Sequence, residues 1–301
     1  MNNSDKKFLV IKWSVNSFER AYNDKLSEYC DVLSVPEVYD VHNTDKNEKK
    51  AQIRDFISKS EQNKPLSQYD KIIVFEDINI ARALGSFLRS KEKVHLWFWN
   101  IYDFSSKDRI KLRLLKKNCS IWTFDEGQAK ALGFNHNTLF YPEDSVMDGH
   151  PDDGYKYDLF FVGLNKGRKD ILDKIDSICK RNGLNAKIVI VGEKDSDGNL
   201  IGPMEYHDVL DCIKNSRAVL EINRRDQVGL TTRSLEALYY GKPLITNNRK
   251  IFEKKYFGKD NACVLDIDDP SGFIEFIKTA TPCYSPDAYE YYSVRKWLER
   301  F

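Results

Sequence analysis

The residues best suited to chemistry lie in one stretch, 226–248, which reads DQVGLTTRSLEALYYGKPLITNN. Thr231 is placed to cap a helix that ends at Gly241, with a proline two residues beyond. The first turn of a helix carries unpaired N–H groups and the positive end of the dipole, so this start can hold a phosphate. Glu236 follows Thr232 by four residues, on the same helix face, where a carboxylate could accept hydrogen bonds from a ribose diol. The alternative is an ordinary capped helix with Glu236 in solvent.

Basic residues follow two predicted strands of the same half. The glycine and basic positions are Gly163, Lys166 and Arg168 after strand 157–163, and Arg224 and Arg225 after strand 219–223. Because the carboxyl ends of parallel strands meet at one edge of a sheet, we expect three separate segments to converge on one anion. Neither G-x-G-x-x-G nor G-x-x-x-x-G-K-[ST] is present, and a basic turn can also be simply solvated.

The composition is typical of a globular protein of two domains. The chain has 301 residues, 41% hydrophobic and 31% charged. Its 47 basic and 46 acidic residues leave a net charge of +1, so we expect no nucleic-acid partner. No stretch approaches the roughly 20 apolar residues of a membrane span and no signal-length apolar core is present, which predicts a cytoplasmic protein. The six cysteines are scattered without a C-x-x-C pair, so we expect buried free thiols.

The chain divides into two halves with the same kind of pattern. Short apolar runs alternate with helical segments in the first half, at 7–13, 31–35, 71–75, 94–99, 120–124 and 137–142. This alternation predicts a parallel sheet covered on both faces, a Rossmann-like α/β domain. The proline-, glycine- and acid-rich stretch near 142–156 is the best linker. We predict a first domain over 1–145, a linker over 146–156, a second domain over 157–284, and a C-terminal helix over 285–301 that could cross back to the first domain.

One pattern resembles a known family. Arg233, Glu236, Ala237 and Gly241, followed by strand 244–246, resemble the donor-binding helix of GT-B glycosyltransferases. The likeness is to bacterial enzymes of the spore-coat and lipopolysaccharide-assembly type in particular, and it covers roughly residues 157–270.

The chain departs from that family at one position. Many such enzymes carry two acidic residues eight positions apart. Here Val228 stands at the first of these positions, and Asp226 lies two residues earlier. The role of the first acid, often a contact to the donor sugar or phosphate, is therefore open.

The resemblance implies a fold and a donor site. The fold is GT-B, in which two Rossmann-like doubly wound domains face each other across a cleft. The turn with Arg168 is similar to the pyrophosphate loop of these enzymes. The residues implied in donor binding are Gly163, Lys166, Arg168, Arg224, Arg225, Thr231, Thr232, Arg233 and Glu236, with Gly192 and Glu193 near the nucleobase. No cofactor is implied, because the nucleotide-diphosphate sugar, in first place a UDP-sugar, is a substrate. No D-x-D follows an early strand, so we expect no metal.

The base for such a transfer should lie in the first half, after a strand. Taking the proton of an acceptor hydroxyl requires a carboxylate or a histidine. Glu76 and Asp77, after strand 71–75, and Asp103, after the aromatic run LWFWNIYDF, are the catalytic candidates, and each could instead be a cap or turn residue. His95 lies inside a strand and is expected to be a core or sheet-edge histidine.

The segment 105–119 is basic and amphipathic. Such a helix can lie against anionic lipid headgroups, which would suit a lipid-linked acceptor and a peripheral place on the inner face of the membrane. A solvated helix with its apolar side on the sheet is the alternative.

These features and the resemblance together predict a glycosyltransferase that moves a sugar from a nucleotide-diphosphate donor to a saccharide or lipid-linked saccharide. The resemblance implies a role in cell-surface polysaccharide or lipopolysaccharide assembly. Two alternatives stay open: a nucleotide-sugar epimerase of the same fold, and a catalytically silent relative that binds a nucleotide or a partner. Retention or inversion stays undecided.

Overall fold

The structure is a computed structural model that describes residues 8–43, 45–143, 147–151, 154–195, 197–224 and 227–301. The chain forms two compact units. Unit 1 comprises Met1–Thr138 and Val294–Phe301, and unit 2 comprises Leu139–Ser293.

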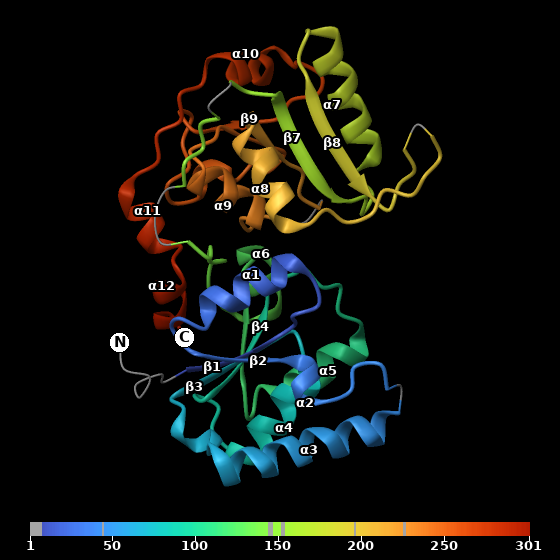
Figure 1. Cartoon of the computed structure of the whole chain (residues 1–301). Helices are drawn as coiled ribbons and strands as arrows, with labels where there is room; N and C mark the ends of the chain where they lie inside the picture. The colour runs from blue at the N-terminus through green and yellow to red at the C-terminus, as the bar shows by residue number, and fades with distance from the viewer. Residues whose placement is uncertain (1–7, 44, 144–146, 152–153, 196, 225–226) are drawn as a thin grey trace. The chain divides into compact units, whose positions relative to one another are not determined.

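Unit 1 is built on a parallel sheet (Figure 1). In spatial order its strands are β2 (Asp31–Ser34), β1 (Phe8–Lys12), β3 (Lys71–Phe75), β4 (Val94–Phe98), β5 (Ser120–Thr123) and β6 (Asn135–His136). Every pairing is parallel. The chain winds outward from β1 in both directions, so the strand order reverses between β1 and β3. At such a switch point the loops after two neighbouring strands part, and a ligand can enter between them.

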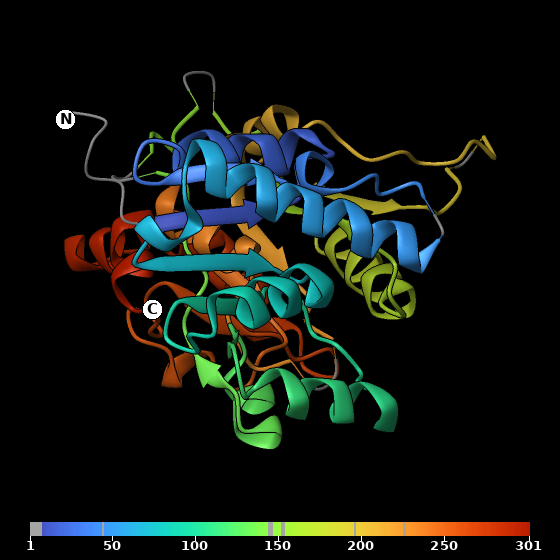
Figure 2. The ribbon, with the colours of Figure 1, turned by 90° about the horizontal axis from the view of Figure 1, so that it is seen from below.

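Helices connect the strands of unit 1. They are α1 (Ser17–Leu26), α2 (Val35–Val38), α3 (Lys46–Asn63), η1 (Leu66–Gln68), α4 (Ile78–Leu88), α5 (Ser106–Leu115), α6 (Glu126–Leu132) and α12 (Val294–Glu299). Seen from below, α3 (light blue) and α4 (teal) lie in front of the strands (Figure 2). Several helices begin at a side chain that accepts a backbone N–H, among them α5 at Ser105 and α6 at Asp125.

The two faces of this sheet carry different cores. Leu9, Ile72 and Leu96 pack in an aliphatic core with the inner faces of α3 and α4. Trp97 points to the opposite face, where its ring lies 5.7 Å from that of Trp297 in α12. Both indoles are fully buried, so the end of the chain completes unit 1 by a large apolar contact.

Unit 2 repeats the topology with five strands. In spatial order they are β11 (Ala262–Val264), β10 (Leu244–Thr246), β9 (Ser216–Glu221), β7 (Tyr157–Leu164) and β8 (Ala186–Val191), all parallel. Its helices are α7 (Lys169–Arg181), α8 (Tyr206–Lys214), α9 (Thr232–Tyr239), η2 (Ile251–Glu253), α10 (Ser271–Thr279) and α11 (Pro286–Tyr291). Figure 1 shows α7 alongside β8. Here the order reverses between β7 and β9. The predicted fold class, two Rossmann-like α/β units, is confirmed.

One predicted strand is wrong. The run 137–142 was expected to pair in the first sheet, but the sixth strand is Asn135–His136, and Tyr141 forms only an isolated bridge with Ser293. Leu139, Phe140 and Tyr141 are buried and belong to unit 2. Their apolar character therefore reflects packing in unit 2, and periodicity cannot distinguish this from a strand.

The predicted linker, 146–156, is only partly described. Gly149 packs closely on the end of α9, where a Cβ atom would lie 1.8 Å from the carbonyl oxygen of Tyr240. The Lys242 ammonium donates to the carbonyl oxygen of Gly149, and also to those of Lys214 and Ser216 at 2.8 and 2.7 Å. This part of the segment is thus fixed to unit 2.

Two predictions about single side chains can be compared directly with the structure. Four of the six cysteines are buried, as expected, whereas Cys283 is exposed. His95 is a core histidine: its Nδ1 accepts from Trp122 Nε1 at 2.9 Å, and its Nε2 lies 3.0 Å from the carbonyl oxygen of Glu92. No helix of the described residues is long and apolar enough to cross a membrane.

Candidate functional site

The turn after β7 is joined to the end of β9 by Arg168. Its Nη1 donates to the carbonyl oxygen of Ile222 at 2.8 Å, and its Nη2 donates to that of Leu164. The guanidinium therefore spans the switch point of unit 2. Gly163 makes this possible, because a Cβ atom there would lie 3.0 Å from Nη2. The turn itself is sharp, since Lys166 and Gly167 both adopt left-handed backbones, with φ of 43° and 78°.

A second guanidinium, that of Arg233, lies at the start of α9 in the same region. Its Nη2 donates to the carbonyl oxygen of Val162 in β7 at 3.4 Å, and its Nη1 pairs with Glu236 Oε2 at 2.6 Å. Glu236 is buried, and burial raises the pKa of its carboxyl while Arg233 opposes the rise. Glu236 therefore faces inward and holds Arg233; the donor contact that the resemblance implies for it stays a prediction.

The start of α9 is fixed by a buried carboxylate. Thr231 is the N-cap, as predicted, and its Oγ1 accepts from the backbone N–H of Arg233 at 3.1 Å. Glu221, at the end of β9, accepts from Thr231 Oγ1 and Thr246 Oγ1, each at 2.6 Å, and from Ser234 Oγ. Three hydroxyls from α9 and β10 therefore meet one carboxylate. This arrangement sets the position of the helix start relative to the sheet.

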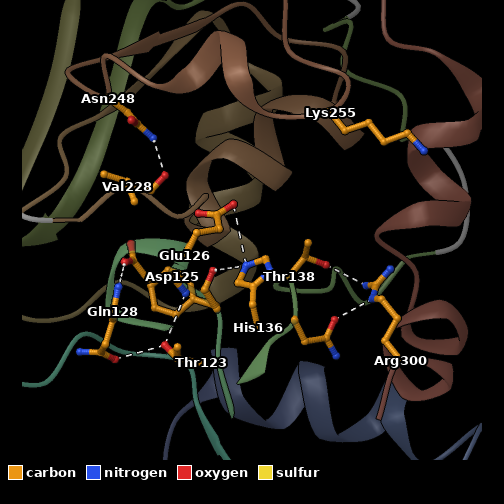
Figure 3. A network of polar contacts seen from close by, with 12 residues as sticks. Thr123, Asp125, Glu126, Gln128, His136, Thr138, Val228, Asn248, Lys255 and Arg300 are labelled. Atoms are coloured by element: carbon orange, nitrogen blue, oxygen red, sulfur yellow. Dashed lines mark hydrogen bonds and ion pairs between the residues drawn. The ribbon is translucent and has the colours of Figure 1, made fainter. Parts of the chain in front are cut away.

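Two asparagines that follow β10 hold the loop between β9 and α9. Asn247 forms two hydrogen bonds with the backbone of Asn223, accepting at 2.7 Å and donating at 3.1 Å. Asn248 Nδ2 donates to the carbonyl oxygen of Val228 at 3.1 Å (Figure 3). Val228 is where the family pattern has its first acid, and here its backbone is part of the loop's support. Arg225 and Asp226 lie outside the described residues.

The loop after β8 joins the same edge. Asn165 Nδ2, in the turn after β7, donates to Glu193 Oε1 at 2.6 Å. Gly192 adopts a left-handed backbone with φ of 88°. The two candidate nucleobase positions, Gly192 and Glu193, are thus next to the turn that carries Arg168. The structure brings together the loops after β7, β8 and β9 with the start of α9.

The charge at this edge of unit 2 is positive. Burial lowers the pKa of Arg168, and the charge of Arg233 lowers it further. Two guanidinium groups therefore interact here, and Glu236 pairs with only one of them. Lys166 and Arg224 add positive charge in the adjoining loops, and Glu193 and Glu221 add negative charge, so four cations stand against three carboxylates with Glu236 included. An excess of cations beside a helix N-terminus is suited to a diphosphate.

The switch point of unit 1 has a different chemistry. Lys12, the last residue of β1, is buried, with its ammonium 4.7 Å from the centre of the Trp99 ring. Glu76, the first residue after β3, has a left-handed backbone with φ of 61°. Its Oε1 accepts from both the backbone N–H and the Nδ2 of Asn100 at 3.0 Å. Burial raises the pKa of Glu76, while hydrogen bonds from Tyr102 and Asn100 oppose the rise.

The other two catalytic candidates lie in different surroundings. Asp77 caps α4, accepting from the backbone N–H groups of Asn79 and Ile80 at 2.8 and 2.9 Å. Its second oxygen accepts from Tyr39 at 2.7 Å. Asp103 lies exposed in the loop after β4. Asp77 thus has a structural role, whereas Glu76 combines a place at the switch point with a raised pKa, as a general base requires.

Sequence reasoning missed Glu221, Asn247 and Asn223. The first and third lie in the apolar run VLEIN and the second in PLITNN, both of which were interpreted as strands. A polar residue at the end of an apolar strand is the only signal that could have found them. No group of His, Cys, Asp and Glu side chains in the described part of the chain could hold a metal ion.

The comparison with protein families gives one match. Residues 168–281 match the family described as "Glycosyl transferase-like". The matched region runs from Arg168 through α9 to the end of α10 and so contains most of the unit 2 edge described above. A search of curated proteins finds no match.

Solved structures resemble the whole chain in fold. A sucrose-phosphate synthase from Thermosynechococcus elongatus has a TM-score of 0.53 at 9% identity, over 98% of this chain and 94% of that chain. An alpha-glucosyltransferase solved with UDP-glucose and DNA containing an abasic site has a TM-score of 0.51 at 14% identity, over 97% of this chain and 93% of that chain. A Methanocaldococcus jannaschii UDP-GlcNAc 2-epimerase has a TM-score of 0.45 at 14% identity, over 98% and 99%, which is too low to bear on the choice between transferase and epimerase. The predicted resemblance to GT-B glycosyltransferases is confirmed; the spore-coat or lipopolysaccharide type stays a prediction.

Proposed function

We propose that the protein is a glycosyltransferase that uses a nucleotide-diphosphate sugar as donor. The observation that carries the proposal is the pair of guanidinium groups, Arg168 and Arg233, beside the capped start of α9 at the switch point of unit 2. The diphosphate would bind at this edge, with Lys166, Arg224, Thr231 and Thr232 around it. Positive charge there stabilises the departing nucleoside diphosphate, which gains negative charge as the bond to the sugar breaks.

In the proposed reaction an acceptor hydroxyl attacks the anomeric carbon of the donor sugar. The bond from that carbon to the phosphate oxygen breaks, and its electron pair leaves with the diphosphate. Glu76 takes the proton of the acceptor hydroxyl. Its raised pKa makes it a stronger base than an ordinary glutamate. A direct displacement of this kind inverts the anomeric configuration. The proposal needs no metal, since the guanidinium groups supply the positive charge.

We propose a UDP-sugar as the donor and a saccharide or lipid-linked saccharide as the acceptor. The alpha-glucosyltransferase of similar fold was solved with UDP-glucose, which supports a trial of UDP-sugars first. A role in cell-surface polysaccharide or lipopolysaccharide assembly comes from the resemblance of the α9 region alone.

A thermal-shift panel with UDP, GDP, CDP, dTDP and ADP, each with and without magnesium, tests the proposal. A nucleotide at about 100 times its dissociation constant should stabilise the protein by roughly 2.7 kcal/mol, a shift of a few degrees. We expect UDP to raise the melting temperature most, and by the same amount with and without magnesium. If none of the five raises the melting temperature, the donor-site assignment is wrong. With a responding donor, product analysis separates transfer to an added acceptor from epimerisation, which needs no acceptor.

The outer face of α5 supports a peripheral membrane contact. Ile110 and Leu114, one turn apart, are 62% and 58% exposed, whereas Leu112 and Leu115 face the core. The basic residues Lys107, Arg109, Lys111, Arg113 and Lys117 lie on and just after the helix. Two exposed apolar side chains amid cations fit an anionic lipid surface. The fraction of protein that sediments with phosphatidylglycerol vesicles should fall when Ile110 and Leu114 are both changed to Ser. It should not fall for the control Leu200→Ser, which changes an exposed leucine of unit 2. Equal binding to phosphatidylcholine vesicles would contradict this contact.

A further inference from the structure

One buried side-chain amide in unit 2 lacks partners. Asn223 is 6% exposed, and within the described residues neither its Oδ1 nor its Nδ2 has a hydrogen-bond partner. Leaving both atoms of a buried amide unpaired destabilises a fold, because water no longer solvates them. Buried polar groups are ordinarily paired, so an exception of this kind indicates a ligand or a functional constraint.

The other buried asparagines of the described chain are paired at both amide atoms. Asn261 accepts from the backbone N–H of Gly258 at 2.9 Å and donates to two carbonyl oxygens at 3.1 and 3.2 Å. Asn248 donates to Val228 and accepts from the backbone N–H of Lys250 at 3.0 Å. Asn137 donates to Trp297 and accepts from Arg300 Nε. The fold therefore satisfies its other buried asparagines, and Asn223 differs from them.

The backbone of Asn223 cannot easily turn to find a partner. Asn247 holds its N–H and its carbonyl oxygen at the same time, at 2.7 and 3.1 Å. The preceding residue, Ile222, is held through its carbonyl oxygen by Arg168. The end of β9 is thus held from both neighbouring strands, by Asn247 after β10 and Arg168 after β7, within the edge that carries the two guanidinium groups. An unpaired side chain on a backbone that is held in place has less conformational freedom to lose on binding.

The amide of Asn223 has one donor and one acceptor atom to satisfy, which limits the chemical groups that can pair with it. A phosphate oxygen only accepts hydrogen bonds, so it would satisfy Nδ2 and leave Oδ1 unpaired. A sugar hydroxyl both donates and accepts, and two adjacent hydroxyls can pair with both atoms of one amide. We propose that Asn223 binds hydroxyl groups of a sugar ring of the donor, either the ribose or the transferred sugar, and that Asn247 positions it. This inference rests on the proposed function.

The test compares Asn223→Leu and Asn223→Ala with the matched control Asn261→Ala. Affinity is measured by calorimetry for pyrophosphate, UDP, UDP-glucose and ADP-glucose, and melting temperatures are taken without ligand. We expect Asn223→Leu to bind UDP-glucose about 10- to 100-fold more weakly, the loss of one or two hydrogen bonds in a buried site. Its pyrophosphate affinity should not change. Its melting temperature without ligand should equal or exceed that of the wild type, because an unpaired amide is gone.

The control should behave in the opposite way. Asn261→Ala removes a fully paired amide, so its melting temperature should fall while its affinities stay unchanged. The variant Asn223→Ala is included in case leucine does not fit the space. Loss of the binding contact should weaken the affinity of both variants, whereas a steric misfit should affect Asn223→Leu only.

The ligand series separates the sources of the hydroxyls. A loss with UDP, UDP-glucose and ADP-glucose alike supports the ribose. A loss with UDP-glucose and ADP-glucose but not with UDP supports the transferred sugar. An equal loss with pyrophosphate would overturn the inference in favour of a phosphate contact. A loss for UDP-glucose without one for ADP-glucose would overturn it in favour of the base. Unchanged affinities would overturn it outright. A wild type that binds none of these ligands would contradict the proposed function itself.

Discussion

The two switch points share a topology and differ in chemistry. In both units the order of strands reverses between the first and the third, β1 and β3 in one and β7 and β9 in the other. Unit 2 has two guanidinium groups and a helix start there, whereas unit 1 has a buried ammonium and a carboxylate with a raised pKa. The same backbone arrangement therefore suits a diphosphate in one unit and a proton acceptor in the other. Topology decides where a site can form, and the side chains after each strand decide what it binds.

The support of the two edges differs as well. In unit 2, Glu221, Asn247 and Asn248 bind the hydroxyl of Thr231 and the backbone of Asn223 and Val228, three described positions of the loop after β9. In unit 1, Asn100 ties Glu76 to the loop after β4. The support at the edge of unit 2 favours recognition of a defined ligand.

The largest effect should come from Glu76→Gln. If Glu76 is the base, turnover should fall about 100- to 10,000-fold, since glutamine cannot take the proton. Nucleotide affinity should stay unchanged, because the proposed nucleotide site lies in unit 2. Initial-rate kinetics with a responding donor measures the first quantity and calorimetry the second. The matched control is Asp103→Asn, on an exposed loop of the same unit. A fall in turnover with Asp103→Asn alone would transfer the role to that residue.

A smaller effect is expected from Arg168→Ala. Nucleotide affinity should fall about 10- to 100-fold at low salt, and the difference from the wild type should narrow as salt rises. The variant Arg168→Lys keeps the charge but cannot bridge the carbonyl oxygens of Leu164 and Ile222 in the same way. Calorimetry at two salt concentrations measures both variants. If Arg168→Ala binds the nucleotide as the wild type does, the diphosphate lies elsewhere.

A third prediction, on stability rather than on turnover or affinity, concerns Lys12 and its pH dependence. Burial lowers the pKa of Lys12 to about 8, and Glu19 and Glu76 oppose the shift. The pKa of a lysine in an unfolded chain is ~10.4. Between these values Lys12 binds more protons in the unfolded chain than in the folded one, so its contribution to the free energy of unfolding should rise with pH, by up to ~3 kcal/mol.

Lys12→Met should remove this contribution, so its free energy of unfolding should rise less with pH than that of the wild type, and it should stabilise the protein at neutral pH. The contribution of Lys242, whose pKa burial lowers to about 7, should remain. Urea unfolding at several pH values from about 7 to 10 measures it. The control Lys174→Met changes an exposed lysine of α7 and should leave the pH dependence as it is. An equal pH dependence in the wild type and in Lys12→Met would show that the pKa of Lys12 is not lowered.

The sequence predicted the helix start of the unit 2 site but not the buried contacts that support it. Thr231 could be identified as a cap because the signal is local. The burial of Glu236 could not be predicted from the sequence. The amphipathic pattern assigns one face of α9 to solvent, whereas the structure buries Ser234 through Tyr239. Glu221 has partners at positions 231, 234 and 246. Such a set depends on the folded arrangement of three elements, which spacing along the chain does not reveal.

Hydrogen exchange with and without the nucleotide that gives the largest thermal shift tests the central claim most directly. If the diphosphate binds at the unit 2 switch point, backbone amides of residues 164–169 and 229–234 should exchange more slowly in its presence. Residues 11–14 and 76–79, at the corresponding edge of unit 1, should exchange at the same rate. Protection confined to the unit 1 segments, or absent from both segments of unit 2, would contradict the account.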